Sequence, residues 1–434
     1  MINMKNVDKS GLLIISNNVL SKTNNNGKTL LSFVDGIEKS RIRQLYFNGQ
    51  KPSVEGYSYY QLSDSDVLKG LFLKKKRGRV WENITVNPDA DKKTANSVSP
   101  KQSFGKTSFL RFLRDLLWIG HWKSKQLFEW LDEFQPETVF FVAGDSGFSY
   151  NIVKKIVRRY RTRLVTYITD DYIMPRKNES LIDRIRRLGI RRKMVSCIQA
   201  SDGYFTISDL MKKDYASITG KDSELIMNLT PSLYDPQYDM HSNDELVMVY
   251  TGSLYYGRDE ILGQIAEAAL RFNHSDLSKK KICIRVYSNT APSDVQRAIF
   301  EREGCCSYCG SLSSEELKAV LNCADVLLFV ESFDPEMMEK TRYSLSTKVP
   351  EYMSVGKPIL AVGPSEIGSM DYLSDVAFCA NSEDTIEDTM MRLVLNPDEV
   401  SEKVSLSVKK YQSQHNIDLK KKLFFDMCFK KEEE

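Results

Sequence analysis

The chain has 434 residues, of which 41% are hydrophobic and 27% are charged, and its formal net charge is +3. This length exceeds what one compact core usually supports, so we expect two domains of an ordinary globular protein. The longest apolar runs fall short of the ~20 residues that a membrane span needs, and the N-terminal apolar stretch is too short for a secretory signal.

The charge is divided unevenly along the chain. Residues 1–234 contain 39 Lys and Arg against 24 Asp and Glu, whereas residues 235–434 contain 22 against 34. A basic half and an acidic half support two domains with different partners. The eight cysteines are too few and too unevenly spread for a disulfide framework, so we expect reduced thiols and a cytoplasmic protein.

The first predicted elements are an apolar strand at residues 12–15, an Asn-rich turn and a helix. The turn contains Gly-Lys-Thr at 27–29, which matches the end of a phosphate-binding P-loop. That pattern also requires a glycine five residues before Gly27, where this chain has Lys22. We therefore reject an ATPase and predict that Asn26 and Gly27 form an anion- or substrate-facing loop at the helix N-terminus. An ordinary turn glycine is the alternative.

Strands and helices alternate through the rest of the first half. Short β-branched or aromatic runs at residues 138–143, 163–169 and 203–207 predict strands, and segments with helical spacing separate them. This alternation is typical of a parallel α/β sheet. The polar stretch at 82–108 has few apolar residues, and we expect a mobile loop there.

A proline-containing linker at residues 229–245 precedes a second series of apolar runs, at 246–252, 281–288, 324–330 and 357–363. The sequence therefore predicts two consecutive α/β domains. We place the N-terminal domain at 1–235, the C-terminal domain at 240–412, and a C-terminal helix at 413–434.

Three loops of the second half carry candidate binding residues, because ligands of open parallel sheets bind beyond the carboxyl ends of the strands. In the first loop, Gly252 and Ser253 end a strand and Arg258 opens the next helix. Free backbone N–H groups beside a guanidinium suit a pyrophosphate. A glycine turn with a surface arginine is the alternative.

The other two loops offer hydroxyls, a lysine and carboxylates. Ser346, Thr347 and Lys348 precede a helix that carries Glu351, so we expect them to form an anion-binding site at the helix N-terminus. The carboxylate of Glu351, one turn further, can accept both hydroxyls of a ribose. A capping cluster is the alternative. Glu331 ends an apolar strand, where a sugar-binding carboxylate would lie, and a solvated loop acid is the alternative.

The order and spacing of "YTGSLYYGR" and "STKVPEYMSVGKPILA" resemble the donor-nucleotide domain of GT-B glycosyltransferases, particularly the family-4-like sugar transferases of bacterial polysaccharide synthesis. "FQPETVFFVAGD", "TYITDDY" and residues 191–228 are similar to parts of the family's first domain. The resemblance covers most of residues 10–415. It implies two Rossmann-like domains facing a cleft, with the C-terminal helix crossing back to the first domain.

The resemblance also implies roles for the candidate residues. Arg258 and Lys348 would neutralise the diphosphate of a nucleotide-sugar substrate, with help from Gly252 and Ser253, and Glu351 would hold the ribose. No metal or other cofactor is expected.

Two positions depart from the family pattern in the donor half. The family's paired glutamates lie eight positions apart, but the residue eight positions before Glu351 is Tyr343. Glu331 lies twenty positions before Glu351 and is the acid that remains for the donor sugar.

The first half departs from the family as well, because Thr169 occupies the position where the family often has histidine. Asp145, Asp170 and Asp171 are then the acids left to contact or deprotonate an acceptor hydroxyl. A retaining enzyme, as the resemblance implies, needs no dedicated base. An inverting enzyme needs one within hydrogen-bond reach, and Asp145 is our first choice for it.

Basic and aromatic residues mix at 72–79 and 107–131. This mixture suggests contact with an anionic membrane surface, on the inner face of the plasma membrane, and a structural helix is the alternative. No nucleic-acid recognition motif is present. The one Cys-x-x-Cys, at 306–309, lacks the second pair that a zinc site needs.

These observations predict a glycosyltransferase of the hexosyltransferase type. It would transfer a sugar from a nucleotide diphosphate to a glycan or lipid-linked acceptor, in the synthesis of cell-surface polysaccharide. Two alternatives remain open. A GT-B-fold epimerase or hydrolase would turn over the nucleotide sugar without an acceptor, and a non-catalytic sugar- or membrane-binding protein would show no turnover.

Overall fold

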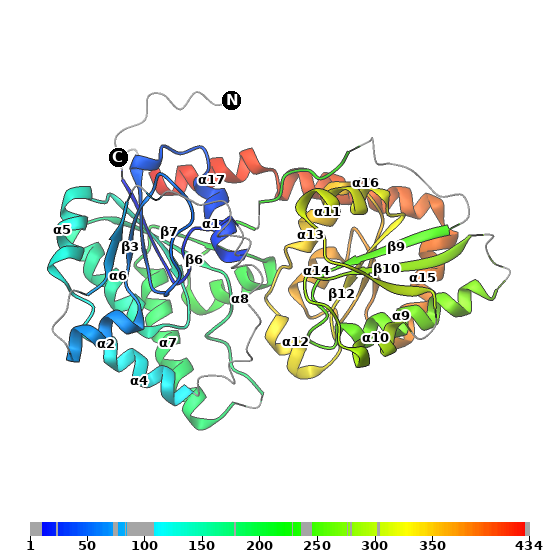
Figure 1. The fold of residues 1–434 in the computed structure, drawn as a ribbon, viewed down its shortest axis with the longest axis horizontal. Helices are drawn as coiled ribbons and strands as arrows, with labels where there is room; N and C mark the ends of the chain where they lie inside the picture. Colours follow the sequence, from blue (N-terminus) through cyan, green and yellow to red (C-terminus); the bar gives the residue numbers. More distant parts are fainter. Residues whose placement is uncertain are drawn as a thin grey trace. The chain divides into compact units, whose positions relative to one another are not determined.

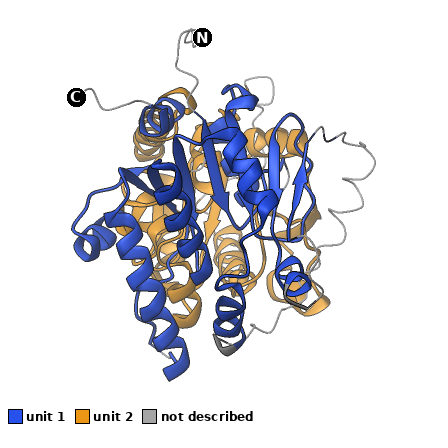
Figure 2. Cartoon of the chain, turned by 90° about the vertical axis from the view of Figure 1, so that its left-hand side faces the viewer, with its two compact units in different colours: residues 1–206, 212–226, 420–434 blue, residues 207–211, 227–419 orange. Residues whose placement is uncertain are grey.

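The computed structural model describes residues 11–22, 25–72, 77–82, 84, 108–177, 179–227, 229–235, 245–275, 277, 280–301 and 304–429. Most of the loop predicted at 82–108 lies outside these residues. The chain divides into two compact units (Figure 2), with residues 1–206, 212–226 and 420–434 in unit 1 and residues 207–211 and 227–419 in unit 2.

Unit 1 contains an eight-stranded sheet in the order β4-β3-β2-β1-β5-β6-β7-β8, in which only β3 and β4 pair antiparallel. Its central strands are nearly continuous apolar runs because helices cover both faces of a parallel sheet. The strands are β1 (Leu12–Ser16), β2 (Ile42–Tyr46), β3 (Ser58–Gln61), β4 (Arg79–Trp81), β5 (Thr138–Ala143), β6 (Arg163–Ile168), β7 (Gly203–Thr206) and β8 (Glu224–Leu225).

The helices that follow these strands are drawn in Figure 1. They are α1 (Asn25–Val34), the short 3-10 helix η1 (Lys39–Arg41), α2 (Asp64–Phe72), α4 (Ser108–Trp118), α5 (Lys125–Phe134), α6 (Gly147–Tyr160), α7 (Leu181–Gln199) and α8 (Asp209–Thr219). Helix α4 packs against α2, α6 and α7.

The last helix of the chain, α17 (Ile417–Phe429), contributes to the core of unit 1. The ring of its Phe424 lies 5.5 Å from that of Phe33 in α1 and 5.0 Å from that of Phe140 in β5. Thr138 Oγ1 donates to the backbone oxygen of Cys428 at 2.7 Å. The expected return of the C-terminal helix to the first unit is therefore confirmed.

Unit 2 contains a six-stranded, fully parallel sheet in the order β11-β10-β9-β12-β13-β14. The strands are β9 (Glu245–Thr251), β10 (Lys281–Tyr287), β11 (Cys306–Gly310), β12 (Val326–Val330), β13 (Ile359–Val362) and β14 (Phe378–Ala380). The helices are α9 (Arg258–Asn273), α10 (Asp294–Phe300), α11 (Ser314–Cys323), α12 (Pro335–Thr341), α13 (Lys348–Val355), α14 (Gly368–Leu373), α15 (Ile386–Leu395) and α16 (Pro397–Gln414), with the 3-10 helix η3 (Glu383–Thr385) before α15.

Both parallel α/β units that the alternation predicted are present. All eight cysteines are free thiols. Within the described part of the chain, every helix is too short or too polar to span a bilayer.

The glycine of the "NNNGKT" turn has a packing explanation. Gly27 is buried in the first turn of α1, and a Cβ there would lie 2.4 Å from the backbone oxygen of Val19 and 2.8 Å from Cβ of Ser21. A contact this short forces the backbone to move. A side chain at Gly27 would therefore push α1 away from the loop that follows β1.

We predict that Gly27→Ala lowers the stability of unit 1 by about 1–3 kcal/mol, the usual cost of overpacking. Gly189→Ala is the matched control, because Gly189 lies inside α7 and a Cβ there meets nothing within 4 Å. Alanine at that position should raise stability by up to about 1 kcal/mol through helix propensity. Thermal melting of both variants measures the effect, and equal melting of Gly27→Ala and wild type would refute the packing explanation.

Candidate functional site

The order of the strands in unit 2 reverses between β9 and β12, which are neighbours in the sheet. At such a reversal the two loops leave in opposite directions, and a crevice opens beyond the carboxyl ends of the strands. Strand β9 ends at Thr251 and is followed by Gly252, and β12 ends at Val330 and is followed by Glu331. Two of the three predicted binding loops therefore lie at this reversal.

An ion pair between Arg258 and Glu331 connects these two loops. Arg258 Nη2 donates to both carboxylate oxygens of Glu331, at 3.0 and 2.8 Å, and Arg258 Nε donates to the backbone oxygen of Val330 at 3.1 Å. Their side chains are only 16% and 6% exposed. Burial raises the pKa of Glu331, although the guanidinium of Arg258 opposes this shift.

The backbone before Arg258 explains why the pair forms. Gly257 caps α9 with φ +72°, a conformation that favours glycine, and a Cβ there would lie 2.9 Å from Oγ of Ser332. The glycine thus lets the start of α9 approach the residue that follows Glu331. Among the described residues, Nη1 of Arg258 has no hydrogen-bond acceptor, so one edge of the guanidinium is left for a ligand.

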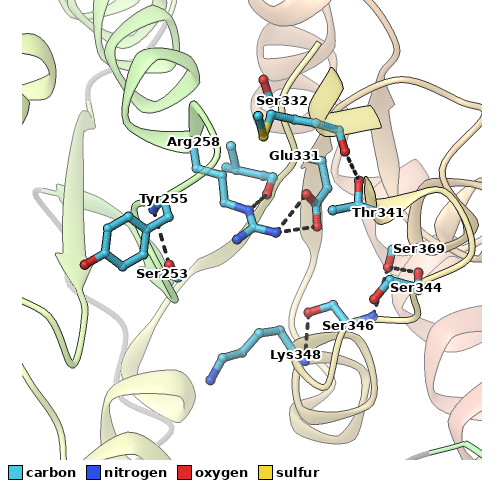
Figure 3. A network of polar contacts seen from close by, with 12 residues as sticks. Ser253, Tyr255, Arg258, Glu331, Ser332, Thr341, Ser344, Ser346, Lys348 and Ser369 are labelled. Atoms are coloured by element: carbon cyan, nitrogen blue, oxygen red, sulfur yellow. Dashed lines mark hydrogen bonds and ion pairs between the residues drawn. The ribbon is translucent and has the colours of Figure 1, made fainter. Parts of the chain in front are cut away.

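The third predicted loop forms the start of α13. Lys348 Nζ lies 3.1 Å from Glu351 Oε2, one turn further along the helix. Ser346 Oγ accepts from the backbone nitrogen of Lys348 at 3.3 Å, and the backbone nitrogen of Ser346 donates to Ser369 Oγ at 3.0 Å. Thr347 precedes the helix and caps it with no side-chain hydrogen bond. Figure 3 draws Ser346, Lys348 and Ser369 in one view with Arg258, which points toward Glu331.

One detail of the first loop corrects the expectation. The backbone N–H of Gly252 is not free, since it donates to the backbone oxygen of Tyr287 at 2.9 Å and extends the pairing with β10. A Cβ at Gly252 would lie 2.8 Å from Oη of Tyr250, which donates to the backbone oxygen of Ser253 at 2.6 Å. Ser253 Oγ accepts from the backbone nitrogen of Tyr255 at 3.2 Å. Gly252 therefore accommodates a tyrosine ring.

The strand order of unit 1 also reverses once, between β1 and β5. Asp145 follows β5 at this point, and its Oδ2 lies 3.0 Å from Arg111 Nη1 and 3.3 Å from Arg186 Nη2. A Cβ at Gly144 would lie 2.9 Å from Nδ2 of Asn17, so the two loops at the reversal are close together. The predicted acid is thus held between two arginines, one on α4 and one on α7.

The other two predicted acids follow β6 and differ from each other. Asp171 Oδ1 accepts from the backbone nitrogens of Ile173 and Met174, at 3.1 and 3.2 Å, and from Tyr215 Oη at 3.0 Å, so it shapes the loop. Desolvation by the surrounding protein raises the pKa of Asp170, and the charges of Asp145 and Asp171 add to the shift. A carboxyl with a raised pKa is suited to proton transfer.

The sequence prediction missed the arginines around Asp145. Together with Arg114, Arg111 and Arg186 line a cavity of about 200 Å³ beside this acid. The sequence contained a clue to them, because Arg111 and Arg114 are spaced one helical turn apart and so lie on one face of α4. What the sequence could not show is that α4 and α7, separated by more than sixty residues, pack against each other.

Asn26 and Gly27 do not join this group by any contact that the structure describes. Asn26 is exposed in the first turn of α1, and Gly27 packs against the loop after β1. The anion- or substrate-facing role expected for this loop stays a prediction. Among the described residues, no group of three or more His, Cys, Asp and Glu side chains is arranged to hold a metal ion.

No protein-family model matches the chain, and no curated protein matches its sequence. Solved structures do match. A sucrose-phosphate synthase from Thermosynechococcus elongatus has a TM-score of 0.59 and 9% identity, over 96% of this chain and 98% of its own. The E. coli structure described as trehalose-6-phosphate bound with UDP-2-fluoro glucose has a TM-score of 0.61 and 12% identity, over 96% and 99%.

A third match is an alpha,alpha-trehalose-phosphate synthase (UDP-forming) from Burkholderia xenovorans in complex with glucose-6-phosphate, with a TM-score of 0.55 and 11% identity over 96% and 99% of the two chains. The chain has the GT-B fold. The two α/β units and the final helix that returns to unit 1 agree with what the resemblance to GT-B glycosyltransferases implied.

We predict that Arg258→Ala destabilises the protein by about 3–5 kcal/mol, because it leaves the Glu331 carboxylate buried without its partner. Arg271→Ala is the matched control, since Arg271 lies on the same helix as Arg258 and makes an exposed pair at 2.7 Å with Glu387 of α15. Exposed pairs contribute under about 1 kcal/mol. Thermal melting of the two variants measures the difference.

The same variant should acquire a pH dependence. A carboxyl whose pKa is higher in the folded than in the unfolded state contributes stability at low pH and loses it as the pH rises. Loss of Arg258 removes the group that opposes the raised pKa of Glu331. The deficit of Arg258→Ala relative to wild type should therefore grow as the pH rises above 4.5, the ordinary glutamate value. A constant deficit would contradict this account of the pair.

Proposed function

We propose that the protein is a glycosyltransferase that moves a sugar from a nucleoside-diphosphate donor, bound by unit 2, to an acceptor bound by unit 1. The observation that carries the proposal is the Arg258–Glu331 pair at the strand reversal of unit 2, together with Ser346, Lys348 and Glu351 at the start of α13. It offers two cations, two carboxylates and a helix N-terminus, which are the groups that a nucleoside diphosphate and its sugar require.

The donor would use the groups that the structure leaves available. Val330 and Glu331 fix the orientation of the Arg258 guanidinium, so Nη1 is ready to donate to a phosphate oxygen without reorganisation. Lys348 has three donors and uses one on Glu351, which leaves the others for the second phosphate. Glu351 accepts the ribose hydroxyls in this proposal, and the buried carboxylate of Glu331 contacts the donor sugar.

The acceptor is proposed to be a glycan or a lipid-linked glycan, as in the synthesis of cell-surface polysaccharide. We infer a retaining reaction, in which the leaving diphosphate oxygen takes the proton of the acceptor hydroxyl. The structural neighbours support a donor of the UDP-sugar kind and an acceptor with a sugar phosphate, since their descriptions name UDP-2-fluoro glucose and glucose-6-phosphate. Asp145 and Asp170 remain the proposed acceptor-side acids.

The donor site is tested by the melting temperature with UDP, GDP, CMP, ADP and ATP. A nucleotide at 100 times its dissociation constant stabilises the folded protein by ~2.7 kcal/mol. We expect a shift with one diphosphate that is lost in Lys348→Ala. It should persist in the control Lys340→Ala, which breaks a comparable Lys–Glu pair on α12. No shift with any nucleotide would favour a non-catalytic binding protein, and a shift with ATP alone would point back to a nucleotidase.

Measuring the release of the nucleoside diphosphate distinguishes a transferase from a hydrolase or an epimerase. A transferase releases it only when an acceptor is present, whereas a hydrolase or an epimerase with hydrolytic turnover releases it from the donor alone. Product anomers then test retention, because a retaining enzyme preserves the configuration of the donor.

We also infer that α4 and the first half of α7 rest on an anionic membrane. Residues 108–123 and 176–193 contain eleven Lys and Arg against three Asp and Glu. Ten of the nineteen large apolar side chains exposed among the described residues lie on these two neighbouring helices and just after α4. They are Leu110, Phe112, Leu113, Leu116, Leu117, Ile119, Leu181, Ile182, Ile185 and Leu188. An apolar surface bordered by cations suits an anionic lipid interface.

The membrane proposal predicts binding to phosphatidylglycerol vesicles that weakens with salt and is absent with phosphatidylcholine. The double variant Ile182→Gln/Ile185→Gln should lose at least about tenfold in binding, because two apolar side chains no longer enter the interface. Val295→Gln is the control, since Val295 is a 72% exposed apolar residue in unit 2. Co-sedimentation measures the binding, and equal binding of the two variants would refute the assignment of this face.

A further inference from the structure

A cavity of about 200 Å³ in unit 1 is not used by the donor chemistry. It lies where α4, α6 and α7 pack together. The residues that line it are Arg111, Arg114, Asp115, Asp145, Ser146 and Arg186. One water needs about 10–15 Å³ of such space, so the cavity is large enough for a phosphoryl group.

The charges in the cavity leave a surplus of guanidinium groups. Arg111 and Arg186 share one carboxylate oxygen of Asp145, so a single negative charge serves two cations. Arg114 pairs instead with Asp64 at 2.7 Å, and Asp64 is not among the lining residues. Asp115 is the remaining acid, and burial raises its pKa even though cations lie near it.

A second observation concerns the side chain of Arg186, which lines the cavity. Its side chain is 13% exposed, and its Nε is buried with no hydrogen-bond partner among the described residues. An unpaired buried N–H costs about 1–3 kcal/mol and is uncommon in native structures. The other bonds of this side chain, to Asp145, do not involve Nε.

The start of α6 adds to the attraction for an anion. Ser146 caps this fourteen-residue helix without a side-chain cap bond, and its Oγ instead accepts from Arg114 Nη1 at 3.1 Å. Lys193 Nζ donates to the backbone oxygen of Gly147 at 2.9 Å, next to the cavity. The positive end of the helix dipole and this lysine therefore lie on the same side as the guanidinium groups.

We propose that this cavity binds a phosphoryl group, with Arg111, Arg114 and Arg186 as the donors that surround it. This site would add an acceptor-binding element to the proposed sugar transfer. It rests on the proposed function in one respect only, that the phosphoryl group belongs to the acceptor. Arginine suits the task because its planar guanidinium binds phosphate oxygens in pairs. A soluble sugar phosphate and the head group of a lipid could both supply this chemistry.

Two sets of binding measurements, made without nucleotide sugar, distinguish these sources. The first follows inorganic phosphate and a hexose 6-phosphate by calorimetry on the full chain. The second follows vesicles of phosphatidylcholine with and without phosphatidic acid. Saturable binding of the small phosphates supports a soluble acceptor, and binding only to phosphatidic acid vesicles supports a lipid head group.

The variants Arg111→Gln and Arg186→Gln locate the binding. Each should weaken it at least about tenfold, as expected for a charge-assisted hydrogen bond. Arg192→Gln is the control because it removes an exposed charge from α7 outside the cavity. Arg111 is 44% exposed, so we expect Arg111→Gln to fold. This variant alone tests the site if Arg186→Gln fails to fold.

Lys348→Ala should retain the phosphate binding, since Lys348 belongs to the donor group of unit 2. A failed donor panel would thus overturn the proposed function and leave the phosphate site standing. The phosphoryl site itself is overturned by two results. One is the absence of saturable binding to both kinds of probe, and the other is binding to Arg111→Gln and Arg192→Gln with the same affinity.

Discussion

Each unit of this protein is organised by one constraint, the single reversal of strand order in its parallel sheet. Strands that are neighbours at the reversal, β1 with β5 and β9 with β12, send their following helices to opposite faces. The backbone beyond their carboxyl ends is then uncovered, and polar side chains can gather there without crossing the hydrophobic core. The Arg258–Glu331 pair and Asp145 occur at these two points.

The proposed donor site of unit 2 combines one cation of fixed geometry, Arg258, with one that can change partner, Lys348. Arg258 is nearly buried and is fixed by a carboxylate and by a backbone carbonyl, so its geometry is set before any ligand arrives. Lys348 is 29% exposed and holds Glu351 through a single contact that can be exchanged for a phosphate oxygen. Charges that are preorganised in this way stabilise a developing negative charge with little reorganisation. This arrangement is the physical basis of the proposed sugar transfer.

The positive charge of unit 1 is concentrated in two places. Part of it surrounds Asp145 in the arginine-lined cavity, and part borders the exposed apolar side chains of α4 and α7. The same helices therefore contribute to both proposals, the phosphoryl site and the membrane-facing surface. An acceptor with a phosphorylated, lipid-linked end would satisfy both features, which unites the two inferences about unit 1.

The sequence by itself determined the two α/β units, because strand-helix alternation is a local property of hydrophobic spacing. It also placed Arg258 and Glu331 in loops that follow predicted strands, and such loops lie at the carboxyl edge of a parallel sheet. Their roles toward a ligand stay predictions. Only the tertiary structure decided which of these groups meet. The use of the Gly252 N–H by β10, the packing of Gly27 and the cavity between α4 and α7 all depend on contacts between segments distant in sequence. The spacing of residues along the chain does not reveal such contacts, because strand order and side-chain packing determine which distant segments meet.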